Sequence, residues 1–424
     1  MKGNLYGVDI KLNPDNKPCL IEVNGQGSGT RGFRIAYGDL RTQKEILSAL
    51  NHFGEGRPIY RKHNNDKRRF SPRKLCLTAL CKAGTLLNDV VNKPLLDLRQ
   101  EWIKEPYETD HKREDSELPE EDYQVAAQEL GIDFRPHSAL KLINPRALRV
   151  KHPSGEYDEI HPGDVGVIWG GNKVFSKTHE FDDVLINPYV TEALLGIKLY
   201  VHRLLEDTTL HEHIPISVPY GMGLLHDLPG EIMSGDKVVY KPNAGGGGQG
   251  VRILSPKDLD SFINPENAKK ANSRLKAFFH QYCDHKSGKV ADTLVKLELD
   301  TMELGSYLVQ EFIPSKPIRS SQTEQDHDSC IRAIIFDGKF IDAYHRLSPR
   351  PLSDPETSLK YIGNLHYGAL AEAVSDEDKT VVADFAENVV RTLEGKIESC
   401  NIVSEQDFRQ FREKFWRGEL ERAS

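Results

Sequence analysis

Alternating apolar and polar residues predict a strand hairpin near the start of the chain. LYGVDIK, residues 5–11, and CLIEVN, residues 19–24, show this alternation, which is typical of half-buried strands. The sequence between them, NPDNKP, is rich in residues that favour turns. We therefore predict two antiparallel strands joined by a turn centred between Asp15 and Asn16.

The hairpin is expected to bring three oxygen-bearing side chains together. With that turn, Asp9 faces Glu22 across the pair, and Asn24 shares a face with Glu22 because side chains two residues apart point the same way. Two facing carboxylates repel each other, so a cation, a basic side chain or water must compensate them. The opposite face is expected to hold the apolar residues Val8, Ile10, Ile21 and Val23.

Strands alternate with helices along the later part of the chain. Apolar runs predict strands at 164–171, 181–188, 216–221, 237–242, 251–255 and 307–313, and a strand hairpin at 330–346. Helical spacing of apolar residues predicts helices at 37–53, 191–207, 256–264 and 375–394. The last helix begins with the capping pair Ser375 and Asp378 and is expected to end at Gly395. This alternation predicts an α/β (α+β) fold.

The composition changes this picture little but excludes some classes of protein. A chain of 424 residues predicts two or three domains, and its net charge of −8 argues against a general nucleic-acid binder. No apolar run of about 18 residues is present, so we expect no membrane association. Six scattered cysteines without metal-ligand spacing, and an N-terminus without an apolar signal core, favour a cytoplasmic protein.

Two charged stretches interrupt the apolar pattern. Residues 57–74 carry eight basic residues and one acidic residue, and residues 104–122 are acidic and contain proline. The basic stretch is most simply a solvated loop, and its sharper interpretation is a site for an acidic substrate or partner. The acidic stretch is interpreted as a surface insertion.

A glycine-rich loop between two apolar strands is the second candidate for chemistry. It lies in KVVYKPNAGGGGQGVRIL, residues 237–254, where Lys241 ends the first strand. The loop residues are Gly245, Gly246, Gly247, Gly248, Gln249 and Gly250. Backbone amides of such loops bind phosphate closely. P-loops and dinucleotide-binding loops lead into a helix, whereas a strand follows here, and the kinase motifs HRD and DFG are absent. A flexible linker is the simpler alternative.

Together these motifs resemble the ATP-grasp enzymes. Lys-Pro before a glycine-rich hairpin, a strand ending in QEFI, and an arginine-bearing hairpin match that family over about residues 183–396, with the hairpin at 1–34 matching its metal strands. In most of the family the metal strands come last, whereas here they come first. The chain therefore resembles a circularly permuted member, an arrangement similar to the eukaryotic type of glutathione synthetase.

The resemblance implies a role for individual residues. It implies that Asp9, Glu22 and Asn24 bind two Mg²⁺ ions and that Lys198 and Lys241 bind ATP, although Lys198 is equally explained as a surface helix residue. The glycine-rich loop would cover the phosphates. The hinge that reads the adenine would comprise Gln310, Glu311, Phe312 and Ile313, a stretch that also reads as an ordinary buried strand.

The remaining implied roles concern the transferred phosphate and the acceptor. Arg332 and Arg346 would hold the transferred phosphate, with surface salt bridges as the alternative explanation. Asn364 matches a family asparagine near the metal strands. GQGSGTRG would line the acceptor pocket, with Ser28 and Arg31 as candidate substrate contacts.

The implied domain division follows the same resemblance. We expect metal strands at 1–34, a substrate region at 35–182, and the core at 183–396, split into a glycine-rich lid at about 200–305 and a catalytic half at about 306–396. A helical tail would follow at 397–424.

Three functions are compatible with these expectations. The favoured one is an ATP-dependent carboxylate–amine ligase that uses an acylphosphate and takes a small-molecule carboxylate and an amine. The second is a small-molecule kinase acting on an anionic substrate, for which the basic stretch would fit. The third is a non-catalytic nucleotide-binding scaffold. Homodimers are common among the enzymes that the chain resembles.

Overall fold

The computed structural model describes most of the chain as an α/β protein. The described residues are 3–25, 30–62, 119–144, 146–161, 163, 166–169, 181, 185–220, 229–243, 251–257, 307–355, 358–365, 368–403 and 405–417. The chain divides into two compact units, the first formed from 1–65, 115–215 and 313–424 and the second from 66–114 and 216–312. This division into units does not test the predicted domain boundaries, which stay predictions.

A five-stranded antiparallel sheet lies at the centre of the first unit. Its order is β18-β17-β16-β1-β2. The strands are β1 (Leu5–Leu12), β2 (Pro18–Gly25), β16 (Ser329–Phe336), β17 (Lys339–Leu347) and β18 (Leu370–Ala373). Every residue of β1 and of β16 is buried, because these strands are internal and are covered on both faces. β2 is an edge strand.

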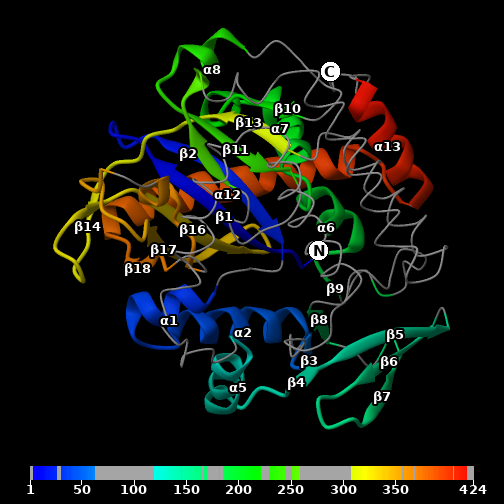
Figure 1. Ribbon diagram of the computed structural model, residues 1–424. Coiled ribbons are helices and arrows are strands. Elements are labelled where there is room, and N and C mark those ends of the chain that lie inside the picture. The colour runs from blue at the N-terminus through cyan, green and yellow to red at the C-terminus, as the bar shows by residue number, and fades with distance from the viewer. Residues whose placement is uncertain are drawn as a thin grey trace, which may run out of the picture. The chain divides into compact units, whose positions relative to one another are not determined.

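Helices cover the two faces of this sheet (Figure 1). The long helix α12 (Asp376–Ser399) contacts β1, β2, β16 and β17 on one face, where alternate residues of β1 such as Val8 and Ile10 join one apolar core. On the other face α1 (Arg31–Tyr37) and α2 (Arg41–Phe53) contribute to a second core that includes Phe33 and Tyr344. Gly32 allows this close approach, because a Cβ there would lie 2.1 Å from the Tyr344 ring.

The first hairpin pairs Asp9 with Glu22 as predicted, but its register changes between that pair and the turn. Asp9 faces Glu22 as predicted, but Ile10 pairs with Leu20, so Ile21 is an extra residue in a β-bulge. The centre of the turn consequently shifts by half a residue, from between Asp15 and Asn16 to Asp15. The prediction for Ile21 was wrong for the same reason: Leu20 enters the core in its place, and Ile21 is only half-buried.

Helix α12 confirms its predicted start but not its predicted end. The Ser375 side chain accepts a hydrogen bond from the Asp378 amide, while the helix continues through Gly395 to a cap at Cys400. Near its end, Glu394 accepts hydrogen bonds from the Asn4 amide at 2.8 Å and the Tyr6 hydroxyl at 3.0 Å. The last turns of α12 are thus tied to the first residues of β1.

The predicted helix at 191–207 is two helices, α6 (Tyr189–Leu195) and α7 (Lys198–Glu206). They are separated by Gly196 and Ile197, and Ile197 has an extended backbone. The short 3₁₀ helix η3 (His211–His213) follows. Helix α13 (Glu405–Arg417) packs its aromatic residues, including Phe411, against Tyr200 of α7.

A four-stranded parallel sheet also belongs to the first unit. Its order is β4-β3-β8-β9, with β3 (Ile59–Lys62), β4 (Phe134–His137), β8 (Val167–Trp169) and β9 (Leu185–Ile186). Helix α5 (Pro119–Leu130) packs against α2 and β4.

Smaller elements complete the first unit. A three-stranded antiparallel sheet consists of β5 (Ala139–Asn144), β6 (Ala147–Lys151) and β7 (Tyr157–Ile160). The pair β14 (Ile318–Arg319) and β15 (Asp326–His327) and the 3₁₀ helix η4 (Ser358–Tyr361) lie between the strands of the central sheet in the sequence.

The second unit contains the two strands that flank the glycine-rich loop. Its sheet has the order β10-β13-β11-β12, with β10 (Ser217–Tyr220), β11 (Val238–Pro242), β12 (Arg252–Leu254) and β13 (Tyr307–Glu311), beside helix α8 (Gly230–Ser234). Strands β11 and β12 pair antiparallel, as the apolar runs on either side of the loop predict.

Within the described ranges, no helix is long and apolar enough to cross a membrane. Of the described cysteines, Cys330 and Cys400 are free thiols.

Candidate functional site

Asp9 lies at the centre of a buried cluster of charges on the five-stranded sheet. Arg332, its neighbour in register on β16, donates from Nε to Oδ1 at 2.5 Å and from Nη2 to Oδ2 at 2.9 Å. Arg346, on β17, forms a second ion pair through Nη2 to Oδ1. All three side chains are more than nine-tenths buried, and they meet because they lie on one face of three adjacent strands.

The cluster keeps its charges despite burial. Burial alone would raise the pKa of Asp9, but Arg332 and Arg346 outweigh it and lower this pKa below its usual range. Burial likewise tends to lower the pKa of Arg346, and Asp9 more than reverses the effect. Burial and the neighbouring Asp9 raise the pKa of the Cys330 thiol to about 11, so this thiol stays protonated beside Arg346.

One donor of the cluster has no acceptor. The Nε of Arg346 is buried and makes no hydrogen bond, although the other end of the same guanidinium contacts Asp9 and, at 3.8 Å, the Cys330 sulfur. A buried donor without a partner costs about 1–3 kcal/mol. An anionic oxygen placed against Nε would remove that cost.

The edge strand β2 adds a second acidic group and a lysine from α7. Lys198 Nζ lies 3.5 Å from Glu22 Oε1. In the orientation that satisfies its neighbours, the Asn24 amide donates to Glu22 Oε1 at 3.1 Å and accepts from Arg332 Nη2 at 3.3 Å. Asn24 therefore links the pair of Glu22 and Lys198 to the buried Asp9 cluster.

The charge balance of this cluster favours an anion over a cation. Among the described ion pairs of this cluster, three positive side chains, Arg332, Arg346 and Lys198, meet two negative ones, Asp9 and Glu22. Oxygens of all three predicted metal ligands are engaged by these cations. Within the described ranges, no group of three or more His, Cys, Asp or Glu residues is placed to hold a metal. Asparagine is not among these residue types, so the metal role of Asp9, Glu22 and Asn24 stays a prediction.

The structure selects among the compensations left open by the sequence. Of a cation, a basic side chain or water, the one found opposite Asp9 is basic, and it comes from strands more than 300 residues away in the sequence. The sequence analysis also missed Lys11, which lies on the same face of β1 and pairs with Asp328 at 2.8 Å. The signal for Lys11 was its spacing of two from Asp9 on a strand.

The predicted nucleotide-binding residues that are described lie in the second unit, apart from Lys198 and Ile313. Lys241 is buried at the end of β11. Gln310 Nε2 donates to the Ser217 hydroxyl at 2.9 Å, and Glu311 Oε2 accepts from the Ile216 amide at 3.2 Å. Both hinge side chains thus bond to strand β10 or the residue before it. The loop Gly245–Gly250 lies outside the described residues, and the roles of all these groups stay predictions.

The predicted acceptor contacts are described only in part. Ser28 lies outside the described residues, and Arg31 is described only as the first backbone position of α1. Asn364 is half-buried, and its backbone carbonyl accepts from the Ala369 amide at 3.2 Å.

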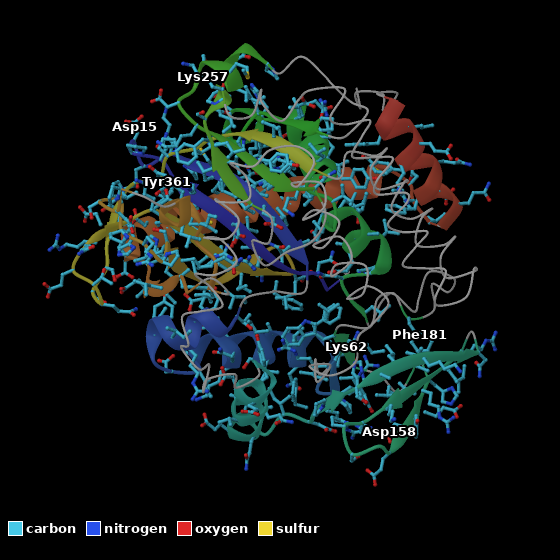
Figure 2. All side chains as sticks on the ribbon, in the orientation of Figure 1. Asp15, Lys62, Asp158, Phe181, Lys257 and Tyr361 are labelled. Carbon is cyan, nitrogen blue, oxygen red and sulfur yellow. The ribbon has the colours of Figure 1, made fainter. Side chains whose placement is uncertain are left out.

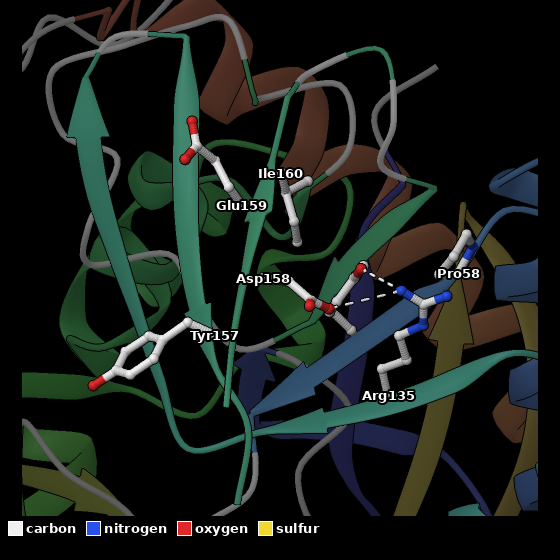
Figure 3. Close-up of a pocket in the computed structure, with 7 residues that line it drawn as sticks. Pro58, Arg135, Tyr157, Asp158, Glu159 and Ile160 are labelled. Atoms are coloured by element: carbon white, nitrogen blue, oxygen red, sulfur yellow. Dashed lines mark hydrogen bonds and ion pairs between the residues drawn. The ribbon is translucent and has the colours of Figure 1, made fainter. Parts of the chain in front are cut away.

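A hollow of about 450 Å³ lies elsewhere in the first unit, between the parallel sheet and β7 (Figure 3). Its arginine, Arg135, donates to both oxygens of Asp133 and to the Tyr60 hydroxyl, and it lies 3.8 Å from Asp158. Figure 3 shows Arg135 pointing towards Asp158 while Tyr157 points away. The donors of this arginine are satisfied within the protein, so the hollow offers little to an anion.

Comparisons with solved structures give distant likenesses, one of which is to a synthetase. No protein-family model matches the chain, and no curated protein is similar in sequence. A crystal structure of a "Putative gamma-glutamylcysteine synthetase" from Methylobacillus flagellatus KT superposes with a TM-score of 0.43 at 11% identity, over 97% of this chain and 91% of that chain.

Proposed function

We propose that this protein is an ATP-dependent ligase that joins a carboxylate to an amine through an acylphosphate. The proposal rests on the ATP-grasp resemblance of its motifs and on one observation above the rest. That observation is the buried cluster of Asp9, Arg332 and Arg346, whose net charge and unpaired Nε of Arg346 suit the oxygens of a transferred phosphate.

The side chains of the cluster have distinct tasks in this proposal. Arg346 offers Nε to an oxygen of the transferred phosphoryl group, and Arg332 supplies the adjacent positive charge. Asp9 fixes both guanidinium groups, because they are anchored to its two oxygens before any substrate arrives. Holding the groups in place in advance lowers the reorganisation needed when charge develops. Lys198, beside Glu22 at the edge strand, is positioned to exchange its carboxylate partner for a phosphate oxygen.

The proposed reaction has two steps. A substrate carboxylate attacks the γ-phosphorus of ATP, which forms an acylphosphate and releases ADP. An amine then attacks the acyl carbon, which forms the amide and releases phosphate. Mg²⁺ would neutralise the phosphates of the bound nucleotide, and no step is assigned here to a metal held by Asp9.

The tie between α12 and β1 supports the permuted arrangement of motifs. Joining the end of a helix near residue 394 to a strand beginning near residue 4 would restore the usual order of the family. Glu394 hydrogen-bonds to Asn4 and Tyr6, so the two segments that such a connection would join are neighbours. A permutation is tolerated when the segments to be joined are close.

Phosphate release with pooled substrates tests the proposal directly. The protein is incubated with ATP, Mg²⁺ and pools of carboxylates and amines, and inorganic phosphate and product masses are measured. Release that requires both a carboxylate and an amine supports the ligase. Transfer of the γ-phosphate to a stable product would support a kinase instead, and absence of ATP binding would support a scaffold.

Two substitutions sharpen this test. We expect Glu22→Ala and Lys241→Ala each to reduce turnover by at least 100-fold while the circular dichroism spectrum is retained. Glu206→Ala and Lys396→Ala are matched controls, since each removes the same type of charge from an exposed ion pair. Wild-type turnover in either test variant would remove the role assigned to that residue.

The kinase remains the second candidate because of one specific feature. The stretch 57–74 carries eight basic residues, and a phosphorylated or otherwise anionic acceptor would suit it. Product analysis separates the two, because a kinase product retains the phosphoryl group and a ligase product does not.

A further inference from the structure

The strand order of the parallel sheet defines a place where small ligands bind in many α/β proteins. Strand β3 comes first in the sequence, β4 pairs with it on one side, and β8 pairs with it on the other. Sheets of this kind bind ligands outside the carboxyl ends of the strands, where the order reverses. Here that place is at the ends of β3 and β8, where Arg61 and Trp169 are paired in register.

Within the described ranges, Arg61 contacts aromatic rings and forms no ion pair with an acid. Its guanidinium carbon lies 3.9 Å from the centre of the Trp169 ring and 4.2 Å from that of Tyr123. The two rings meet edge to face at 5.0 Å, so they form a rigid corner. Cation–π contact of this kind fixes the plane of the guanidinium while leaving its N–H groups free to donate. Figure 2 marks the position through Lys62, the next residue along β3.

Two polar atoms in this corner are buried without a hydrogen bond of good geometry, although the Tyr123 hydroxyl faces the Thr30 and Arg61 side chains. They are Nη1 of Arg61 and the hydroxyl oxygen of Tyr123. Burial raises the pKa of Tyr123, and the nearby Arg61 and Thr30 side chains partly oppose the shift, which places Thr30 at the same corner. Each unmet buried group costs about 1–3 kcal/mol, so two together call for an acceptor that belongs to a ligand.

The surrounding charges leave Arg61 available. The nearest acid in the sequence to Tyr123, Asp122, forms its ion pair with Arg34 of α1. Arg135 on the neighbouring strand β4 differs from Arg61. It also lies over a tyrosine ring, at 5.5 Å, but it donates hydrogen bonds to Asp133 and Tyr60. Only Arg61 of these two arginines lacks an acceptor for a buried donor.

We propose that Arg61 and Tyr123 bind the carboxylate of a small substrate, an amino acid or short peptide. One guanidinium and one neutral hydroxyl match a single negative charge, whereas a phosphate dianion would remain partly uncompensated. Thr30 belongs to GQGSGTRG, the segment at 25–32 expected to line the acceptor pocket, so this carboxylate would anchor the acceptor. The role of the bound molecule as the acceptor rests on the proposed ligase function. The binding of a carboxylate by Arg61 and Tyr123 does not depend on that function.

Fluorescence of Trp169 provides a direct test without nucleotide. The chain has three tryptophans, Trp102, Trp169 and Trp416, so Trp102→Phe with Trp416→Phe leaves Trp169 as the only one. Each of the common amino acids is titrated beside its own carboxamide, and inorganic phosphate is titrated as the competing anion. We expect at least one amino acid to shift the Trp169 emission saturably, and its carboxamide to bind at least tenfold more weakly.

Three variants in this background assign the effect to residues. Arg61→Ala should weaken the amino acid at least tenfold, and Tyr123→Phe, which removes only the hydroxyl, by about three- to tenfold. Arg149→Ala is the matched control, since Arg149 also stacks on a tyrosine, Tyr157, at 4.6 Å but is exposed. The control should bind as the starting protein does.

Several results would overturn the inference. They are the absence of any saturable shift, equal binding of acid and carboxamide, equal saturation by phosphate, or unchanged binding in Arg61→Ala. Failure of the ligase is separable, because it would show as no ATP-dependent turnover while the Trp169 titration still succeeds. Conversely, if Arg61→Ala turned over both substrates with unchanged KM, this inference would be refuted and the proposed ligase function would stand.

Discussion

The Asp9 cluster and the Arg61 corner are two buried charged regions of the same unit that are built in opposite ways. In the Asp9 cluster, guanidinium groups meet a carboxylate at hydrogen-bonding distance. At the Arg61 corner, the guanidinium meets two aromatic rings, and its buried donor has no acceptor. Both lie on sheets with apolar cores beneath them.

The difference shows how burial distinguishes a self-contained charge network from a site that awaits a ligand. Removing one member of a paired network leaves an uncompensated charge, which is strongly destabilising. Removing a group that already lacks a partner costs little, because its desolvation was never compensated. Substitutions in the Asp9 cluster should therefore lower the free energy of unfolding more than substitutions at the Arg61 corner. Substitutions at the Arg61 corner should weaken binding of the carboxylate ligand more than they lower stability.

The largest effect is expected from Asp9→Ala. Two buried arginines would lose their counter-charge, so the free energy of unfolding should fall by about 3–5 kcal/mol. Urea denaturation followed by circular dichroism measures this change. Asp158→Ala, which removes a carboxylate 42% exposed beside Arg135, is the control and should cost about 1 kcal/mol or less. Equal losses in the two variants would contradict the contrast between paired and exposed charges.

Acidification is expected to have the next largest effect, because each of the two sheets carries a buried histidine. Burial lowers the pKa of His137, with help from Lys62 and His152, to about 4, and burial lowers that of His345 to about 4. His345 contacts the Ser329 hydroxyl at 2.7 Å, whereas both ring nitrogens of His137 are unpartnered.

The direction of this pH effect follows from proton uptake by the unfolded chain. Below about pH 6.5 the unfolded histidines bind protons that the folded ones do not, so stability falls as the pH drops from about 6.5 to 4. Each histidine should contribute on the order of 3 kcal/mol over that window. His137→Gln and His345→Gln should each flatten the slope, and the exposed His161→Gln should not. A slope unchanged in both buried variants would refute this assignment.

Arg61→Ala should have a small effect on stability although Nη1 of its guanidinium is buried. The loss is the cation–π contact and its packing, about 1 kcal/mol, because no ion pair is broken. Arg332→Ala, which removes one of the two guanidinium partners of Asp9, provides the contrast and should cost several times more in the same urea titration. If Arg61→Ala proved as damaging as Arg332→Ala, the guanidinium would have a partner that the corner does not show.

Tyr123→Phe should have the smallest effect and the opposite sign. Deleting a buried hydroxyl that makes no hydrogen bond removes an unmet desolvation cost, so the variant should be as stable as the parent or more stable by less than about 1 kcal/mol. Thermal unfolding is sufficient to measure the sign. Destabilisation beyond 1 kcal/mol would indicate that the hydroxyl is bonded in the folded protein.

The sequence alone determined the local framework of the protein. Alternation placed β1 opposite β2 with Asp9 facing Glu22, the capping pair placed the start of α12, and apolar runs placed the strands around the glycine-rich segment. These features depend on neighbouring residues and on the two-residue and 3.6-residue periods of strands and helices. Periodic patterns do not show where a strand carries one extra residue, so the bulge at Ile21 was not predicted. Likewise, a glycine does not always end a helix, so the continuation of α12 past Gly395 was not predicted.

Only the tertiary structure decided which charges meet and which remain unpaired. Asp9 receives its arginines from residues 332 and 346, and Arg61 receives its rings from residues 123 and 169. The basic stretch at 57–74 predicts charge but not which of its members turns inward. That choice depends on strand order and on the helices packed above the sheet, and neither is encoded in any short segment of the chain.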